Sequence, residues 1–582
     1  MSGPILFLVP ARGGSVRVPG KNLRTVAGIP LVGQAVRIAR LAAARVPGGP
    51  HRIVCSTDDP GIAAAAREWG AEILDRPAEL ATAEATSVDV ALHAIDAVAA
   101  TGPATTPIRA VVLVQPTSPL TDPADLVAAV ERFDASGGRA VASITTVHPA
   151  GWHVASEVGP PGEDDVIRRI DADDADEILS GAVFVIAPDE LRTTRRFDEP
   201  GTIGLSIPPE RSIDVDEPAD LVLANALAAA RPIRPIEIAG HGIGEGRVFV
   251  IAEGGVNHNG SPELAFRLVE AAADARADAV KFQTFDPATL AAAGAPTAEY
   301  QRRSGSGADQ RAMLATLALP AEAWAAIRDH AHDRGLVFLS TPFDDASADL
   351  LEGLGVPAFK IASGELTNLP FIERLARRGR PLLVSTGMAD MVEVAQAVDA
   401  IAAAGDPPLA LLHCVSSYPA RAADANLRAI ATMRAAFGVP VGWSDHTLGI
   451  ELPLAAVAAG AVLVEKHLTL DRMMTGPDHA ASLEPQELRA MVSGIRTVEA
   501  ALGSGEKRPV EAERAVAAVA RKSLHWGRSL AAGALVGEAD LAAMRPGTGL
   551  SPARQAEFVG RRTARDVSAG AMVAPDDLEG PA

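Results

Sequence analysis

Several residues that could carry chemistry follow short apolar segments in the second half of the chain. Neutral imidazoles such as His446 and His467 can bind one divalent metal ion and leave positions open for a substrate oxygen and water. Lysine ammonium groups and serine hydroxyls suit the oxygens of a phosphorylated substrate. The residues of that kind are Lys281, Lys360, Ser363 and Ser385. The residue types therefore indicate a metal site beside a site for a phosphorylated compound.

The apolar segments that hold these residues alternate with Ala/Leu/Arg-rich stretches of helical length. They span residues 248–253, 279–283, 337–341, 358–363, 382–386, 410–414, 439–446 and 461–467. Strands that alternate with helices predict parallel pairing with right-handed crossovers. Eight units in about 230 residues match a closed (β/α)8 barrel, whose catalytic groups lie at the carboxyl ends of the strands. We therefore predict a TIM barrel over residues 247–503, with its active site at that end.

A second group of candidate residues lies near the N-terminus. A buried-strand pattern over residues 5–9 leads into a glycine-rich loop with the cations Arg12, Arg17 and Lys21. Glycines let backbone N–H groups approach phosphate oxygens, and cations neutralise their charge. The spacing is not Gly-x4-Gly-Lys-Ser/Thr, which disfavours a P-loop ATPase. A nucleotide triphosphate site is the hypothesis, and a basic surface turn is the alternative.

Further strand patterns follow this loop and indicate an open α/β nucleotide-binding domain over residues 1–230. They span residues 52–56, 110–115, 140–144, 181–186 and 202–207, with helical stretches over 28–44 and 122–135. Near the end of this domain, Asp214 and Asp216 lie two residues apart on an extended segment. Alternate residues of a strand point to one side, so both carboxylates can share a hard cation.

Length and composition limit the remaining possibilities. A chain of 582 residues exceeds a single core, so several domains are expected, with Pro/Gly-rich or polar linkers over 231–246 and 504–520. A net charge of −20 argues against a nucleic-acid partner. Cys55 and Cys414 are expected to be reduced thiols. No secretory signal or membrane-length segment is evident, so we expect a cytoplasmic protein without a membrane partner.

The N-terminal motifs resemble the CMP-N-acylneuraminate cytidylyltransferases. They are Pro10-Ala-Arg-Gly-Gly-Ser15, Ser56-Thr-Asp-Asp59, Gln115-Pro-Thr-Ser-Pro119, Ser180-Gly-Ala-Val-Phe184 and Ile213-Asp-Val-Asp216. The resemblance implies that CTP is held by Arg12, Ser15, Lys21, Asn22 and Gln115, and that Mg2+ is held by Asp214 and Asp216. Val16 stands where the family usually has Lys, and Thr121 where it has Arg. A degenerate nucleotide-binding or regulatory module is therefore kept as an alternative.

The barrel motifs resemble the sialic acid synthases, which condense phosphoenolpyruvate with an N-acylated hexose. They are Ile251-Ala-Glu-Gly-Gly-Val-Asn-His-Asn-Gly260, Asp278-Ala-Val-Lys-Phe-Gln-Thr284, Lys360-Ile-Ala-Ser-Gly-Glu365, His413-Cys-Val-Ser-Ser-Tyr-Pro419, Trp443-Ser-Asp-His-Thr447, Glu465-Lys-His-Leu-Thr-Leu470 and Gly476-Pro-Asp-His-Ala-Ala-Ser482. The resemblance implies that His446 and His467 bind Mn2+ or Mg2+, which polarises the acceptor aldehyde as a Lewis acid.

The same resemblance implies roles for the other residues of the barrel site. Phosphoenolpyruvate is expected to contact Lys281, Lys360, Ser363 and Ser385, with Thr341 nearby. The acceptor is expected to contact Gln283, Tyr418 and Asp478, and Ser444 is a further substrate-binding candidate. Glu253 and Glu465, with Lys281, are expected to manage the water or the charge that develops at the enolpyruvate carbon.

Residues 521–582 resemble the SAF (antifreeze-like) domain that ends this synthase family. The match rests on residues 521–533, on Met544-Arg-Pro-Gly-Thr-Gly-Leu-Ser-Pro552 and on residues 569–573. It implies a domain-swapped homodimer in which Arg545 reaches the N-acyl group of the acceptor in the partner subunit.

The leading hypothesis is a bifunctional enzyme that makes a nonulosonic acid and activates it with CTP. The acceptor is N-acetylmannosamine or a diacetamido trideoxyhexose, and the product an acid of the sialic, legionaminic or pseudaminic type. A synthase with an inactive N-terminal domain and a non-catalytic scaffold for polysaccharide assembly are the alternatives.

Overall fold

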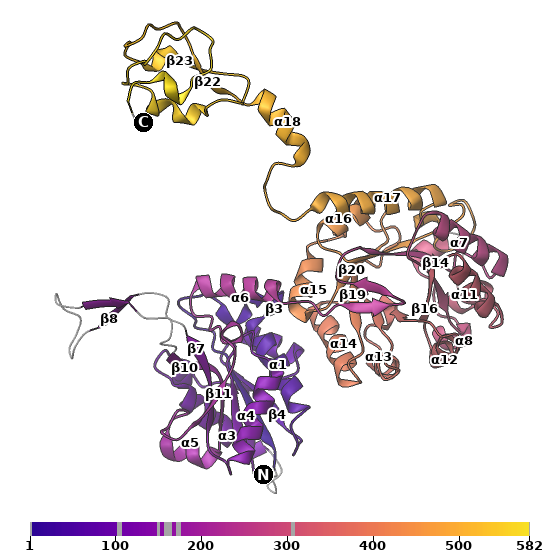
Figure 1. The fold of residues 1–582 in the computed structure, drawn as a ribbon. Coiled ribbons are helices and arrows are strands. Elements are labelled where there is room, and N and C mark those ends of the chain that lie inside the picture. Colours follow the sequence, from indigo (N-terminus) through magenta and orange to yellow (C-terminus); the bar gives the residue numbers. More distant parts are fainter. Residues whose placement is uncertain are drawn as a thin grey trace. The chain divides into compact units, whose positions relative to one another are not determined.

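The structure is a computed structural model that describes residues 3–101, 107–147, 152–155, 166–169, 176–303 and 309–580. The chain forms two compact units, Met1–Ala501 and Leu502–Ala582. The first unit contains a mixed sheet and a parallel barrel (Figure 1). Among the described residues, no helix has both the length and the apolar character needed to cross a membrane.

The N-terminal sheet has seven strands in the order β11-β7-β10-β6-β1-β4-β5. Their bounds are β1 Ile5–Pro10, β4 Arg52–Thr57, β5 Glu72–Asp75, β6 Ala110–Val114, β7 Val141–Val147, β10 Asp176–Ile186 and β11 Ile203–Ser206. Most neighbours run parallel, but β10 is antiparallel to both β6 and β7. A separate ribbon pairs β8 (Trp152–Ala155) with β9 (Val166–Arg169).

Helices cover both faces of this sheet, because the apolar side chains of β1 point alternately to one face and the other. Ile5, Phe7 and Val9 enter one apolar cluster and Leu6 and Leu8 another. The principal helices are α1 Leu31–Ala43, α2 Pro60–Glu68, α3 Ser87–Thr101, α4 Pro123–Ala135, α5 Pro188–Thr194 and α6 Pro218–Ala230. Successive side chains of a strand point to opposite faces, so a strand that is apolar throughout needs cover on both sides. The predicted open α/β domain is confirmed.

The central part of the chain forms an eight-stranded parallel barrel in the order β16-β15-β14-β21-β20-β19-β18-β17. The strands are β14 Phe249–Gly255, β15 Ala279–Thr284, β16 Val337–Pro342, β17 Phe359–Ile361, β18 Leu382–Ser385, β19 Leu409–Cys414, β20 Val441–Asp445 and β21 Leu463–His467. The hydrogen-bonded ladder runs from β16 round to β17, and these two end strands lie side by side. The predicted barrel is confirmed.

An outer layer of helices surrounds these strands (Figure 1). The principal helices are α7 Pro262–Asp274, α11 Ala323–Asp333, α12 Asp345–Gly353, α13 Leu369–Ala376, α14 Met391–Ala403, α15 Ala429–Phe437, α16 Glu451–Ala458 and α17 Pro485–Leu502. Shorter helices, α8 Pro287–Leu290, α9 Glu299–Arg303 and α10 Gln310–Leu317, lie between β15 and β16. Ser261, Asp344 and Asp390 cap three outer helices by accepting hydrogen bonds from first-turn backbone N–H groups. Such caps let a helix begin close to a strand end, where the polar residues gather.

Residues 231–246 were expected to be an irregular connector, but the structure shows a hairpin there. Strands β12 (Ile236–Ile238) and β13 (His241–Ile243) pair antiparallel. Their isoleucines join an apolar cluster with side chains from the barrel strands, including Phe249 and Leu383. The hairpin therefore forms part of the barrel core.

The second unit is small and rich in turns. Its strands β22 (Ser523–Trp526) and β23 (Leu541–Met544) pair antiparallel beside a compact apolar cluster that includes Trp526 and Phe558. The preceding segment was expected to be a polar connector over 504–520. It contains helix α18 (Glu511–Ala520), none of whose residues is buried.

Candidate functional site

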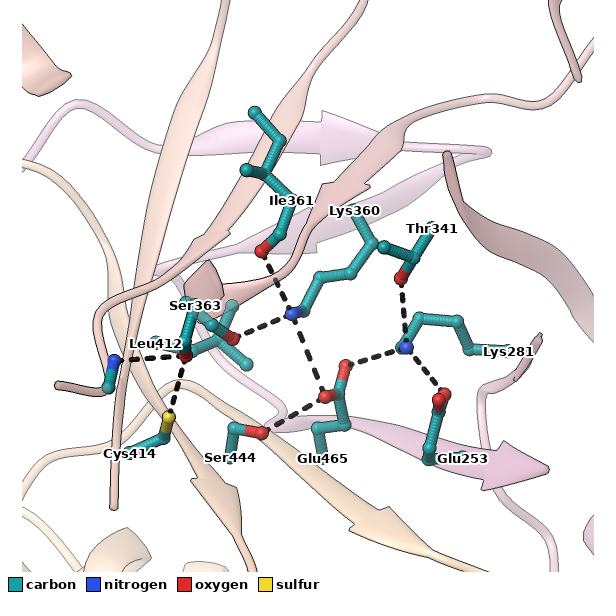
Figure 2. A network of polar contacts seen from close by, with 12 residues as sticks. Glu253, Lys281, Thr341, Lys360, Ile361, Ser363, Leu412, Cys414, Ser444 and Glu465 are labelled. Atoms are coloured by element: carbon teal, nitrogen blue, oxygen red, sulfur yellow. Dashed lines mark hydrogen bonds and ion pairs between the residues drawn. The ribbon is translucent and has the colours of Figure 1, made fainter. Parts of the chain in front are cut away.

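A network of buried lysines and glutamates occupies the carboxyl end of the barrel. Strand β14 places Glu253 opposite Lys281 of β15 in the parallel ladder. Lys281 Nζ lies 2.5 Å from Glu253 Oε2, and both side chains are at most 4% exposed. The same ammonium donates to Thr341 Oγ1 at 3.1 Å (Figure 2). Gln283 donates to the second oxygen of Glu253 at 3.2 Å.

Glu465 joins this pair to a second lysine. Its carboxylate lies 3.8 Å from Lys281 Nζ and 3.7 Å from Lys360 Nζ. Ser444 Oγ donates to Glu465 at 3.0 Å (Figure 2). Lys360 donates to Ser385 Oγ at 2.6 Å. Two lysines and two glutamates from different strands therefore form one connected network.

Burial governs the protonation of this network. Burial raises the pKa of the Glu253 carboxyl, although the nearby Lys281 ammonium opposes that shift. The pKa of Lys360 is lowered by burial. For Glu465, the two lysines outweigh burial and lower the pKa. The raised pKa of Glu253 and the lowered pKa of Lys360 are shifts of the kind found at sites of general acid and base chemistry.

Gly255, the last residue of β14, shapes the backbone just after Glu253. The ladder between β14 and β15 shifts register between Glu253 and Gly255. Gly255 has φ 50°, and a Cβ there would lie 3.1 Å from Glu253 Oε1. A side chain at this position would therefore press on the carboxylate.

His446 and His467 approach each other beside this network. Their ring centroids are 5.4 Å apart, and the Tyr418 ring lies 4.2 Å from that of His446. His446 Nδ1 donates to Val415 O at 2.8 Å when it carries the proton, which leaves Nε2 with a free lone pair. The predicted pairing of the two imidazoles is present.

The two imidazoles are suited to a divalent cation. Burial lowers the pKa of both, so they are neutral donors near neutral pH. His467 Nδ1 is buried without a hydrogen-bond partner among the described residues, and Asp478 Oδ2 lies 3.9 Å away. Burial raises the pKa of Asp478 to about 6. Within the described ranges no group of three or more His, Cys, Asp or Glu residues could hold a metal, so water or substrate would supply the other ligands.

Ser363 stands at the side of the site formed by β17 and β18. Its hydroxyl contacts Cys414 Sγ at 3.1 Å (Figure 2). The same hydroxyl accepts from Gly387 N at 3.0 Å. A Cβ on Gly387 would lie 2.2 Å from Ser416 Oγ. Cys414 was expected only to be a reduced thiol, but its position at the end of β19 could have indicated this contact.

The N-terminal candidates meet in a pocket of about 310 Å3. It is lined by Arg12, Ser15, Lys21, Asn22, Gln115 and Asp216. Asn22 donates to Arg12 O at 2.9 Å, which holds the glycine-rich loop against the short helix that begins at Lys21. The five predicted nucleotide-binding residues therefore lie around one cavity.

The predicted acidic pair is only partly in this pocket. Asp216 lines it and forms ion pairs with Lys21 at 2.9 Å and Arg17 at 3.1 Å. Asp214 is not among the lining residues. Arg76 does line the pocket and was missed in the sequence, although Arg76-Pro77 directly follows the short strand β5.

Arg545 lies directly after β23 in the second unit. There its Nε donates to Ala520 O at 3.1 Å, and the residue is exposed. Its predicted contact with an acceptor stays a prediction.

Comparison with known proteins gives three family matches in chain order. The models described as Cytidylyltransferase, NeuB family and SAF domain match residues 6–155, 268–507 and 521–579. An N,N'-diacetyllegionaminic acid synthase from Legionella pneumophila is 44% identical over 336 residues, 57% of this chain and 94% of that protein. One from Campylobacter jejuni is 42% identical over 318 residues, 54% of this chain and 95% of that protein.

A solved structure titled N-acetylneuraminic acid (sialic acid) synthetase, from Leptospira borgpetersenii, is 34% identical. It covers 49% of this chain and 96% of that chain, with a TM-score of 0.44. The three resemblances predicted from the motifs are confirmed by the family matches.

Proposed function

Since the chain belongs to the NeuB family, with a cytidylyltransferase domain before the synthase barrel and a SAF domain after it, we propose two consecutive reactions. The barrel condenses phosphoenolpyruvate with an N-acyl hexose and releases phosphate. The N-terminal domain then transfers CMP from CTP to the nonulosonic acid product. Both activities are transferase reactions, and each has its own site in the chain.

The observation that carries the first proposal is the network of Lys281, Lys360, Glu253 and Glu465. Buried lysines beside Thr341, Ser363 and Ser385 offer the carboxylate and phosphate of phosphoenolpyruvate cations and hydroxyl donors in a site of low dielectric. Glu253, with its raised pKa, can hold or accept a proton beside the enolpyruvate carbon.

The acceptor sugar is proposed to bind beside His446 and His467. A divalent ion between His446 and His467 would act as a Lewis acid on the acceptor aldehyde. Gln283, Tyr418 and Asp478 present an amide, a phenol and a carboxyl group to hydroxyl and N-acyl groups. Identity is 44% and 42% to two N,N'-diacetyllegionaminic acid synthases, against 36% to the N-acetylneuraminate-9-phosphate synthase of Mus musculus and 32% to a pseudaminic acid synthase. This order favours a product of the legionaminic type and therefore a diacetamido trideoxyhexose as acceptor.

The test of the barrel reaction is phosphate release from phosphoenolpyruvate with a panel of N-acyl hexoses. We expect release that requires a divalent metal and is fastest with a diacetamido trideoxyhexose, with the product identified by mass spectrometry. His446→Ala is expected to abolish it. Release that is unchanged by chelation or by His446→Ala would overturn the proposal.

The second reaction is proposed on the cavity lined by Arg12, Lys21 and Asp216. Incubation of the synthase product with CTP is expected to yield a CMP-sugar and pyrophosphate, and Asp216→Ala is expected to prevent this. If CTP binds without turnover, the domain is the regulatory module that Val16 and Thr121 suggest.

The SAF domain is proposed to complete the barrel site of a second subunit through Arg545. Arg545→Ala and His446→Ala should each be nearly inactive alone. After mixed refolding, up to about a quarter of wild-type activity should return, because half of the dimers are mixed and each has one intact site. No recovery would contradict domain exchange.

A further inference from the structure

Next to the histidines in the sequence lies a further ion pair, fully buried, that the proposed chemistry does not use. Asp445 ends strand β20 and Lys466 lies in β21, opposite each other in the parallel ladder. Lys466 Nζ is 2.5 Å from Asp445 Oδ2, and both side chains are 0% exposed. Each residue directly precedes one of the proposed metal ligands, His446 and His467.

The pair does not face the substrate site. One ladder position earlier, Ser444 and Glu465 belong to the network inside the barrel, where they share a hydrogen bond of 3.0 Å. Successive residues of a strand point to opposite faces, so Asp445 and Lys466 point outward into the layer between the strands and the helices. There Lys466 experiences the charges of Glu487, in α17, and of Arg472.

The contacts of the pair continue past His446. Lys466 Nζ also donates to the backbone carbonyl of Thr447. Asp445 Oδ1 accepts from Thr447 N at 3.0 Å and from Thr447 Oγ1 at 2.8 Å. Both chain neighbours of His446 are therefore tied to the residue that precedes His467.

We propose that Asp445, Lys466 and Thr447 form a clamp that sets the separation of the His446 and His467 imidazoles, and so act as positioning residues for the metal. The inference rests on the proposed metal site. A fully buried ion pair adds little net stability compared with apolar residues of similar size, because desolvation opposes the attraction. The contribution of this ion pair is instead geometric. It joins β20 and β21 at one point, so the residues that follow it, His446 and His467, lie at a fixed separation. When residues that orient metal ligands without contacting the metal are mutated, the metal affinity typically changes.

The test measures binding of Mn2+ alone to the metal-free full-length chain by titration calorimetry. All proteins carry Asp216→Ala, so that the N-terminal carboxylates do not contribute. The double variant Asp445→Asn/Lys466→Met removes both links that Lys466 makes between the two strands and leaves no unpaired buried charge. We expect its dissociation constant for Mn2+ to rise about 10- to 100-fold. The Mn2+ concentration for half-maximal phosphate release should rise by the same factor, while the KM for phosphoenolpyruvate at saturating Mn2+ stays within about two-fold of wild type.

Arg496→Met is the matched control, because Arg496 pairs with the buried Asp278 at 2.8 Å, at the start of β15. It is expected to lower the melting temperature without changing Mn2+ affinity by more than about two-fold. If the double variant does not fold, Thr447→Val removes the hydrogen bond from the Thr447 hydroxyl to Asp445, and the dissociation constant should rise about two- to five-fold. Unchanged affinity in the folded clamp variants overturns the inference. If His446→Ala also leaves Mn2+ binding unchanged, the proposed metal site itself is wrong.

Discussion

The two candidate anion sites of this chain are built in opposite ways. In the barrel, Lys281 and Lys360 are at most 4% exposed, and each lies near a buried glutamate. In the N-terminal pocket, Arg17 is 62% exposed and its partner Asp216 is 40% exposed. The barrel site is a buried, charge-balanced network, whereas the N-terminal site is an open cavity with cations at its edge.

This difference decides how each site responds to change. Charges in a buried network interact strongly and are screened little by salt, so the loss of one member leaves its partner in a medium that solvates it poorly. Exposed pairs contribute little to stability and are easily exchanged for a ligand or for water. We therefore expect barrel variants to affect both folding and chemistry, and pocket variants to affect chemistry almost alone.

The largest effect is expected for Lys281→Met. It leaves Glu253 and Glu465 without their shared ammonium, so the free energy of unfolding should fall by roughly 3–5 kcal/mol. Phosphate release should fall about 10^3-fold, because a cation aimed at the substrate is lost. Chemical denaturation and a phosphate assay measure the two effects.

Arg234→Met is the control for the stability part of that prediction. Arg234 forms an ion pair with Asp406 at 2.7 Å in which both side chains are more than half exposed. Its loss should change the free energy of unfolding by less than about 1 kcal/mol. Equal destabilisation by the two variants would show that burial is not what separates the sites.

A smaller effect on stability and a clear effect on chemistry are expected for Lys21→Met. CMP transfer should fall about 10^2-fold, since Lys21 lines the pocket as one of its few cations. Its partner Asp216 is partly exposed, so stability should change by less than about 1 kcal/mol. Arg24→Met, next to the pocket but not lining it, is the matched control. A synthase rate that falls in parallel with CMP transfer would contradict the separation of the two sites.

Much of the barrel could be predicted because its chemistry lies at strand ends. Residues such as Lys281 and His467 interrupt apolar segments, and the parallel ladder brings such interruptions to one end of the barrel. The hairpin over 236–243 was missed, because Pro and Gly around it suggested a linker. Its alternating Ile236-Glu237-Ile238, followed by the turn at Ala239 and Gly240, could have indicated a strand pair.

Other features were not predictable from patterns along the chain. That Lys466 pairs with Asp445, and not with a carboxylate inside the barrel, depends on which face each residue occupies in the folded ladder. Arg76 reaches the N-terminal pocket only because β5 adds to the edge of the sheet beside β4. Distances such as the 5.4 Å between the His446 and His467 rings depend on barrel closure, which local spacing does not encode.

Burial of the barrel region also predicts its behaviour in acid. Burial lowers the pKa of His258 from 6.5 to about 4. Between about pH 6.5 and about pH 4 this imidazole binds a proton in the unfolded chain but not in the folded chain. The free energy of unfolding therefore falls as the pH falls through this range. Between about pH 7.5 and about pH 5, wild type should lose about 2 kcal/mol more than His258→Gln. Chemical denaturation at both pH values, with metal chelated, measures the difference. Equal losses of unfolding free energy in the two proteins would show that His258 is not the cause.

The smallest effect, and the one that most directly probes the open pocket, is expected for Val16→Lys. Val16 lines the pocket, is 86% exposed and adjoins Arg17 in the glycine-rich loop. A lysine there adds a cation at the pocket edge without displacing any packed side chain, so the KM for CTP should fall about two- to five-fold at low salt. The gain should shrink as salt is added, because exposed charges are screened over about 10 Å at 0.1 M ionic strength. Val16→Met, of similar length but uncharged, should leave the KM unchanged. An equal gain in both variants would mean that side-chain length, and not charge, limits nucleotide binding, and the contrast between an electrostatically open pocket and a closed barrel network would then have to be abandoned.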